Sequence, residues 1–121
     1  MATRRRQRKQ MTEDRARLVL EYTQFPNNTY GCIDLIKRAG HEHINTNRGL
    51  VPLERETSDD RIRAYAHRLY EEAQIVLGRK LSPRMQAVTD HWYNHLYEIF
   101  NIPPEQRGDV VPSDLEAELL K

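Results

Sequence analysis

The apolar residues between Ile62 and Leu77 recur every three or four positions, and no other feature of this sequence constrains its fold as strongly. That spacing places them along one face of an α-helix. The preceding residues 57–60 (TSDD) supply a helix start, and Gly78 supplies an end. The stretch therefore predicts a long amphipathic helix with one face buried in a core.

The same kind of pattern predicts three further helices and a short terminal one. We expect them at 13–24 with Thr12 as cap, at 29–39 with Thr29 as cap and Gly40 as the closing residue, from Ser82 and Pro83 to Asn101, and from Ser113, where Glu116 completes a capping box. No stretch alternates as a strand does, although the irregular residues 41–57 include a short extended segment around 50–53. The predicted fold class is all-α: a small bundle of four helices plus a short C-terminal helix.

Length and composition favour one domain with three parts. We expect a basic, disordered arm over 1–11, a helical domain over 12–101 and an acidic C-terminal tail with a short helix over 102–121. No apolar run approaches the roughly 20 residues that span a bilayer, and no apolar stretch follows the first cations as it does in a secretory signal. A lone Cys32 fits a reducing compartment. These features predict a cytoplasmic protein without a membrane partner.

The charges are segregated along the chain. There are 19 cations and 18 anions, and five of the cations fall within the first ten residues, so the remainder carries a net charge of −4. Arginine forms paired hydrogen bonds with phosphate, and clustered cations bind nucleic acids by releasing counterions. We therefore predict contact with a DNA or RNA backbone, with an acidic protein patch or no specific role as alternatives. The predicted contact residues are Arg4, Arg5, Arg6, Arg8 and Lys9, and the basic track would extend to Lys37, Arg38 and Arg48.

The segment "MTEDRARLVLEYTQFPNNTYGCIDLIKRAGH" resembles the start of helix-turn-helix DNA-packaging proteins, the small terminase subunits of tailed phages. The matching positions are Thr12, Glu21, Tyr22, Asn28, Thr29, Ile36, Ala39 and Gly40, which cover about a quarter of the chain. The resemblance implies phage DNA binding, oligomeric assembly, a packaging-motor partner and, for a phage-encoded chain, a virion-associated location. The family's pattern would place a recognition-type helix soon after Gly40, where this chain has a His/Asn-rich stretch.

The sequence predicts no metal, no cofactor and no enzyme. His91 and His95 lie four residues apart, and His41 and His43 lie in the irregular stretch, but no further ligand completes a zinc set. Cys32 has no nearby base and is expected in the core. Neighbouring acids such as Glu71 and Glu72 diverge on a helix, and no glycine-rich phosphate loop is present.

Aromatic residues form a second stripe on the predicted helix 83–101, beside a core stripe of Met85, Val88, Trp92, Leu96 and Ile99. Two stripes indicate burial on two sides, either in the centre of the bundle or at a subunit interface. Leucines of the last helix would dock a partner or fold back on the same bundle. The predicted interface residues are Trp92, Tyr93, Tyr97, Phe100, Leu115 and Leu119.

Together these features predict a non-enzymatic, nucleic-acid-associated structural subunit of a larger complex or homo-oligomer. The alternative is a protein–protein adaptor or accessory subunit that makes no nucleic-acid contact. Phosphate contacts position a protein without reading bases, so sequence specificity does not follow from this pattern.

Overall fold

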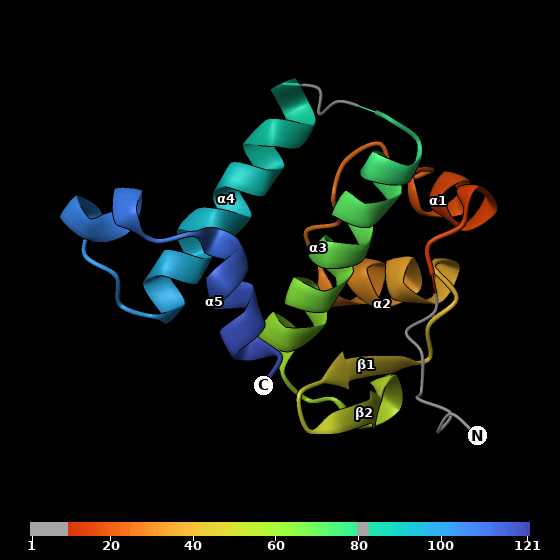
Figure 1. The fold of residues 1–121 in the computed structure, drawn as a ribbon, viewed down its shortest axis with the longest axis horizontal. Helices are drawn as coiled ribbons and strands as arrows, with labels where there is room; N and C mark the ends of the chain where they lie inside the picture. Colours follow the sequence, from red (N-terminus) through yellow and green to blue (C-terminus); the bar gives the residue numbers. More distant parts are fainter. Residues whose placement is uncertain (1–9, 80–82) are drawn as a thin grey trace, which may run out of the picture.

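The computed structural model describes residues 10–79 and 83–121, and this part of the chain is mostly helical (Figure 1). The basic arm residues Arg4, Arg5, Arg6, Arg8 and Lys9, and the expected cap Ser82, lie outside the described residues. The helices are α1 (Glu13–Val19), α2 (Thr29–Arg38), α3 (Asp59–Val76), α4 (Pro83–Ile99) and α5 (Pro112–Leu119), with two short 3-10 helices, η1 (Leu53–Arg55) and η2 (Pro104–Asp109).

Most helix ends follow the local sequence. The Thr12 hydroxyl accepts a hydrogen bond from the Arg15 amide at 3.2 Å, and the Ser58 hydroxyl accepts one from Arg61 at 3.3 Å, as expected for caps. Gly40 and Gly78 close their helices with positive φ angles of 87° and 61°. At α2 the cap is Asn28, whose side chain accepts from the Gly31 amide at 2.7 Å; the expectation of a Thr29 cap was wrong by one residue.

The first helix is shorter than expected, because α1 ends at Val19 rather than at residue 24. Side chains of other helices bind two carbonyl groups at this end of the helix and in the turn after it. The Arg38 guanidinium donates to the Leu18 carbonyl at 3.1 Å, and the Tyr70 hydroxyl donates to the Tyr22 carbonyl at 3.0 Å. The chain is therefore free to turn at 20–28 and lead into α2.

A β-hairpin replaces the irregular stretch between α2 and α3, so the expectation of a chain without strands was wrong. Strands β1 (His43–Thr46) and β2 (Gly49–Pro52) pair antiparallel, with Thr46 opposite Gly49. The expected extended segment at 50–53 overlaps β2. The Asn47 amide in the turn donates to the Leu120 carbonyl at 3.2 Å, which joins the hairpin to the end of α5.

Helix α5 begins at Pro112 with Val111 in the cap position, and no side chain caps it. The predicted capping box of Ser113 and Glu116 is therefore wrong. Glu116 is instead 1% exposed and faces α3 and α4, where other groups bind its carboxylate.

Helix α3 is the centre of the fold. It packs against α1 and α2, and α5 packs against both α3 and α4, lying between them in Figure 1. The expected buried faces are largely confirmed: Ala16, Val19, Cys32, Ile36 and the α3 residues from Ile62 to Ala73 on the predicted stripe are buried. The side chains of Met85 and Val88 lie outside the described part of α4.

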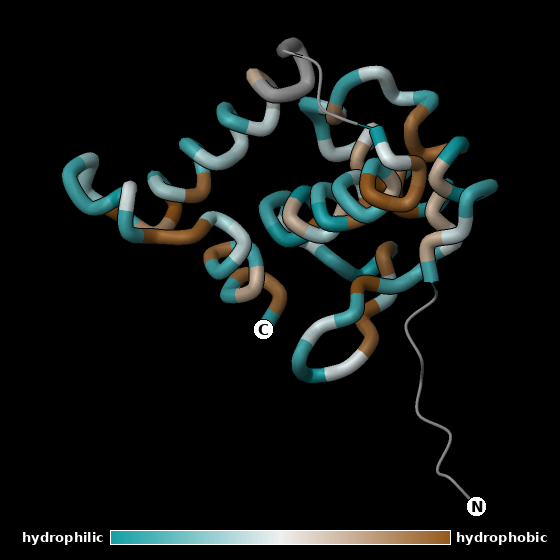
Figure 2. The backbone as a smooth tube through the Cα atoms, turned by 45° about the horizontal axis from the view of Figure 1, so that its top comes forward, coloured by the Kyte–Doolittle hydropathy of each residue, from teal (hydrophilic) through white to brown (hydrophobic). Residues whose placement is uncertain are grey.

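Hydrophobic residues also mark the C-terminal end of α5 in Figure 2, where Leu120 is 3% exposed and contributes to the core. Among the described residues, no helix has both the length and the apolar character needed to cross a membrane.

Candidate functional site: a buried histidine between two glutamates

Three titratable side chains converge in the interior where α3, α4 and α5 meet. The His67 Nδ1 atom lies 2.8 Å from Glu116 Oε2 and 3.0 Å from Glu71 Oε1, and it donates to these carboxylates. His67 and Glu71 are four residues apart on α3, which brings both to one side of the helix. Glu116 reaches them from α5. The side chains of His67 and Glu116 are each 1% exposed, whereas that of Glu71 is 45% exposed.

Helix α4 supplies two donors that orient the carboxylates. The Trp92 Nε1–H group donates to Glu116 Oε2 at 2.8 Å, and the Tyr93 hydroxyl donates to Glu71 Oε1 at 3.4 Å. The rings of Phe25 and Tyr93 pack edge to face against the imidazole, with centroids 5.3 and 5.5 Å from that of His67. We refer to His67, Glu71 and Glu116 as the His–Glu–Glu cluster.

Each charged group of the cluster favours the ionised form of its partner. Burial alone would lower the pKa of His67, but the hydrogen bonds to Glu116 and Glu71 outweigh it and raise that pKa to about 9. The same hydrogen bond from His67 lowers the pKa of Glu71 below its usual value. Burial and the two carboxylates raise the pKa of Tyr93, so its hydroxyl stays a donor. At neutral pH the cluster therefore holds an imidazolium between carboxylates.

One atom of the cluster has no polar partner. His67 Nε2 is buried and makes no hydrogen bond to any described residue. Buried polar groups in folded proteins are nearly always hydrogen-bonded. The imidazole is therefore held through Nδ1 alone on its polar side, while aromatic rings pack against it.

The arrangement limits the chemistry that the cluster can perform. With His67 and Glu116 almost fully buried, an organic substrate has no direct access to the imidazole. A proton or a small cation can be held, because one nitrogen and two carboxylate oxygens lie within 4.8 Å of one another.

The histidines that the sequence singled out do not join this cluster. His95 Nε2 lies 3.1 Å from Asp60 Oδ1, His91 is exposed, and the buried His41 Nδ1 lies 2.7 Å from the Tyr65 hydroxyl. Among the described residues they belong to no set of three converging metal-binding groups. Cys32 is fully buried, as expected, and burial raises the pKa of its thiol to about 11.

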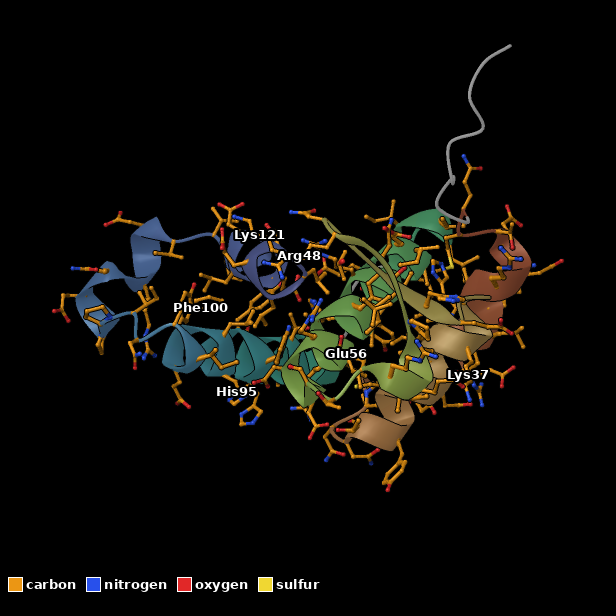
Figure 3. All side chains as sticks on the ribbon, turned by 90° about the horizontal axis from the view of Figure 1, so that it is seen from below. Lys37, Arg48, Glu56, His95, Phe100 and Lys121 are labelled. Atoms are coloured by element: carbon orange, nitrogen blue, oxygen red, sulfur yellow. The ribbon has the colours of Figure 1, made fainter. Side chains whose placement is uncertain are left out.

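The described members of the predicted basic track are not brought together. Arg38 is bound by Asp34 and Glu21, each at 2.8 Å, so its charge is already compensated. Lys37 and Arg48 are exposed, but Figure 3 shows them well apart, with Arg48 near Lys121 on another side of the molecule. A continuous basic surface linking these three residues is therefore absent from the described part of the chain.

Lys37 also lines an open pocket of about 550 Å³ between α2 and the hairpin. The charged groups around it are mixed, because Glu42 and Glu54 line the pocket together with Lys37 and His43. The two carboxylates disfavour an anionic ligand there.

The predicted interface residues make extensive contacts within the chain. Trp92 and Leu115 are buried, and Tyr93, Phe100 and Leu119 are partly buried and pack against the core. The Tyr97 hydroxyl donates to the Val110 carbonyl at 3.2 Å. Burial of α4 on two sides is thus explained by α5 and by the chain after η2, and a subunit interface at these residues stays a prediction.

Sequence reasoning did not identify the His–Glu–Glu cluster. It treated Glu71 only as a neighbour of Glu72, assigned Glu116 to a cap and did not single out His67. A signal was present on the helix predicted between the start signal at 57–60 and Gly78, where Arg63, His67, Glu71 and Gln74 form a polar row beside the apolar stripe. Such a row shows that His67 and Glu71 can pair, but it does not reveal the third partner.

Comparison with protein-family models, with curated proteins and with solved structures gave no match to this chain.

Proposed function

We propose that the protein is a non-enzymatic, nucleic-acid-associated subunit of a larger assembly, and that its basic N-terminal residues contact phosphates. The observation that carries this proposal is the concentration of five cations in the first ten residues, against a net charge of −4 in the rest of the chain. A polyanion is attracted to such a local excess of positive charge.

The ion pairs among the described residues support the same assignment. Several cations after the first ten residues are paired with acids of the same chain, so they add little to the attraction for a polyanion. These pairs are Arg17 with Glu13 and Asp14, Arg38 with Asp34 and Glu21, Arg61 with Glu56, and Lys121 with Glu118. The N-terminal cations are therefore the better candidates for phosphate contact.

The resemblance to small terminase subunits would make the nucleic acid phage DNA. The segment that carries it contains α1 and α2, but the hairpin β1–β2 follows Gly40 where the family pattern would place a recognition-type helix. This departure bears against base recognition by a helix after α2. Phosphate contact by the N-terminal residues does not require such a helix.

The test is binding of labelled mixed-sequence DNA and RNA by fluorescence anisotropy over a series of salt concentrations. We expect the full chain to lose affinity as salt rises, with a slope of log K against log salt of roughly −4 if most of the five cations contact phosphates. A variant with Arg4, Arg5, Arg6, Arg8 and Lys9 all changed to glutamine keeps the length of the segment. It should bind weakly and lose most of this slope.

Two control variants distinguish the contribution of the N-terminal cations to binding from that of exposed cations elsewhere in the chain. Lys37→Gln and Arg48→Gln remove exposed charges that the structure places far apart, and each should change the slope by about one unit or less. Affinity that is unchanged in the five-residue variant would refute the proposal.

A second candidate is an adaptor or accessory subunit that makes no nucleic-acid contact. It is favoured by large apolar side chains on the surface, because Tyr30 is 86% exposed, Ile75 78% and Val111 54%. The salt series distinguishes the two, since an adaptor of this kind would bind neither DNA nor RNA even at low salt.

A further inference from the structure

We propose that His67, Glu71 and Glu116 form a binding site for one divalent transition-metal ion, which fastens α5 to α3. The ligand atoms would be His67 Nδ1 and one oxygen of each carboxylate, which lie within 4.8 Å of one another. They come from two helices, and His67 and Glu116 are 49 residues apart in the sequence. This inference is independent of nucleic-acid binding.

The three ligand atoms already lie close to one another. Zinc binds histidine nitrogen and carboxylate oxygen at about 2.0–2.2 Å, so two ligands in a tetrahedral site lie about 3.3 Å apart. His67 Nδ1 is now 2.8 Å from Glu116 Oε2 and 3.0 Å from Glu71 Oε1. An ion between them would widen these two separations by a few tenths of an ångström and would hold the two carboxylate oxygens about 3.3 Å apart, within the 4.8 Å that encloses all three ligand atoms.

The charge of the cluster matches a divalent cation. Two carboxylates and a neutral imidazole together carry a charge of −2, which a divalent ion neutralises. A proton on His67 neutralises only half of that charge and leaves one net negative charge on two carboxylates, of which Glu116 is buried and Glu71 is half-exposed. Because burial penalises uncompensated charge, the site favours the ion with two positive charges.

The carboxylates are already oriented by neighbouring donors. Trp92 Nε1–H donates to Glu116 Oε2, and the Tyr93 hydroxyl donates to Glu71 Oε1. Metal sites commonly hold their ligands through such hydrogen bonds. Only part of Glu71 reaches solvent, with 45% of its side chain exposed, so the ion and a water ligand would enter beside this residue.

The donor set indicates the class of metal. Imidazole nitrogen with two carboxylate oxygens suits Zn²⁺ and neighbouring first-row ions. Ca²⁺ takes six to eight oxygen ligands, and Mg²⁺ requires octahedral oxygen coordination. Three protein ligands that include a histidine therefore favour Zn²⁺ over either. This departs from the sequence-based expectation, which weighed His91 and His95 and predicted no metal.

The experiment uses the full chain, freed of metal by chelation and dialysis. Zn²⁺ is titrated calorimetrically, Co²⁺ is added as a spectroscopic probe, and thermal unfolding is followed with Zn²⁺, Ca²⁺ or Mg²⁺. We expect one Zn²⁺ per chain, a visible Co²⁺ absorption band of tetrahedral intensity, and a rise in the unfolding temperature with Zn²⁺ but not with Ca²⁺ or Mg²⁺.

Variants locate the ion. Glu71→Gln is the main test, because this half-exposed side chain can change without opening the core, and it should weaken Zn²⁺ binding by at least about 10-fold and remove the Co²⁺ band. Glu72→Gln on the same helix and His91→Gln on the surface of α4 are matched controls that should bind as the unchanged protein does. His67→Asn should also remove the band, and circular dichroism reports whether it folds.

Three results would overturn the proposal. They are no Zn²⁺ binding, an equal response to Ca²⁺ or Mg²⁺, and Zn²⁺ binding or a Co²⁺ band that survives Glu71→Gln. The last result would place the ion on other residues, including the exposed His91.

Discussion

The carboxylate of Glu116 shows how a single buried charge is maintained. It is 1% exposed and accepts hydrogen bonds from His67 and from Trp92 Nε1–H, both at 2.8 Å. A hydrogen bond to a charged group contributes about 1.5–3 kcal/mol, and the loss of one partner leaves part of the charge without compensation. The Trp92 indole is therefore important for stability beyond its apolar surface.

We predict that Trp92→Phe lowers the free energy of unfolding by about 2 kcal/mol, because it removes the donor to a buried carboxylate. Tyr97→Phe is the matched control: it removes a hydroxyl that donates to the neutral Val110 carbonyl, and it should cost about 1 kcal/mol or less. Urea unfolding measures both. Equal losses in the two variants would show that the Trp92–Glu116 bond has no special role.

For single residues, the sequence predicted which side chains are buried better than it predicted which side chains contact one another. Cys32, Ile36 and Leu69 were expected in the core from helical spacing, and they lie there. His67 could not be assigned its role because its second carboxylate, Glu116, lies 49 residues away on a helix whose position depends on the whole fold. Local spacing carries no information about that contact.

Helix ends allow a test at the scale of elements. The sequence gives Ser58 and Ser113 similar cap patterns, but only Ser58 accepts a hydrogen bond from a backbone amide in the structure. We predict that Ser58→Ala lowers the free energy of unfolding by about 1 kcal/mol and that Ser113→Ala has little effect. Chemical denaturation of the two variants measures this difference, and a larger loss at Ser113 would restore the capping box.

The contribution of the contacts between α1 and α2 to the stability of the protein depends on pH. The Tyr22 hydroxyl donates to Asp34 at 2.6 Å, and this bond, with a further one from Arg38, lowers the pKa of Asp34 below its usual 3.8. The contribution of Asp34 is thus present above the usual pKa and is lost as the pH falls through the lowered value.

We therefore predict that Asp34→Asn destabilises the protein at neutral pH and that the difference from the unchanged protein shrinks in acid. Urea unfolding at several pH values measures it. Asp14→Asn is the control, because the Asp14 side chain is 95% exposed at its ion pair with Arg17 and should show a smaller effect throughout. A difference that grows on acidification would contradict the argument.

The elements themselves were predictable in proportion to their length. Helix α3 follows directly from its apolar spacing between clear start and end signals. The hairpin has strands of four residues, too short for alternation to be recognised, and its turn is joined to the rest of the fold by a non-local hydrogen bond between Asn47 and Leu120. Helix α1 was overestimated at its end, where Arg38 of α2 donates to the Leu18 carbonyl and Tyr70 of α3 donates to the Tyr22 carbonyl in the turn after the helix.

For the whole molecule, the central position of α3 predicts a gradient of local stability. Its buried face contacts α1, α2 and α5, whereas η2 has no buried residue. We predict that native-state hydrogen exchange is slowest for the amides of 64–73 and fast for those of η2, because local opening costs more where packing is extensive. Comparable exchange in both segments would contradict a core centred on α3.

The exposure of η2 also makes this segment a site where the backbone can be cut without disturbing the core. A protease cut within it would break the backbone but leave the contacts of Leu115, Glu116 and Leu120 with the rest of the molecule in place. The severed C-terminal peptide would then act as a ligand of the larger fragment. We therefore expect two separately made pieces to reassemble, and the affinity between them would measure how tightly α5 is held.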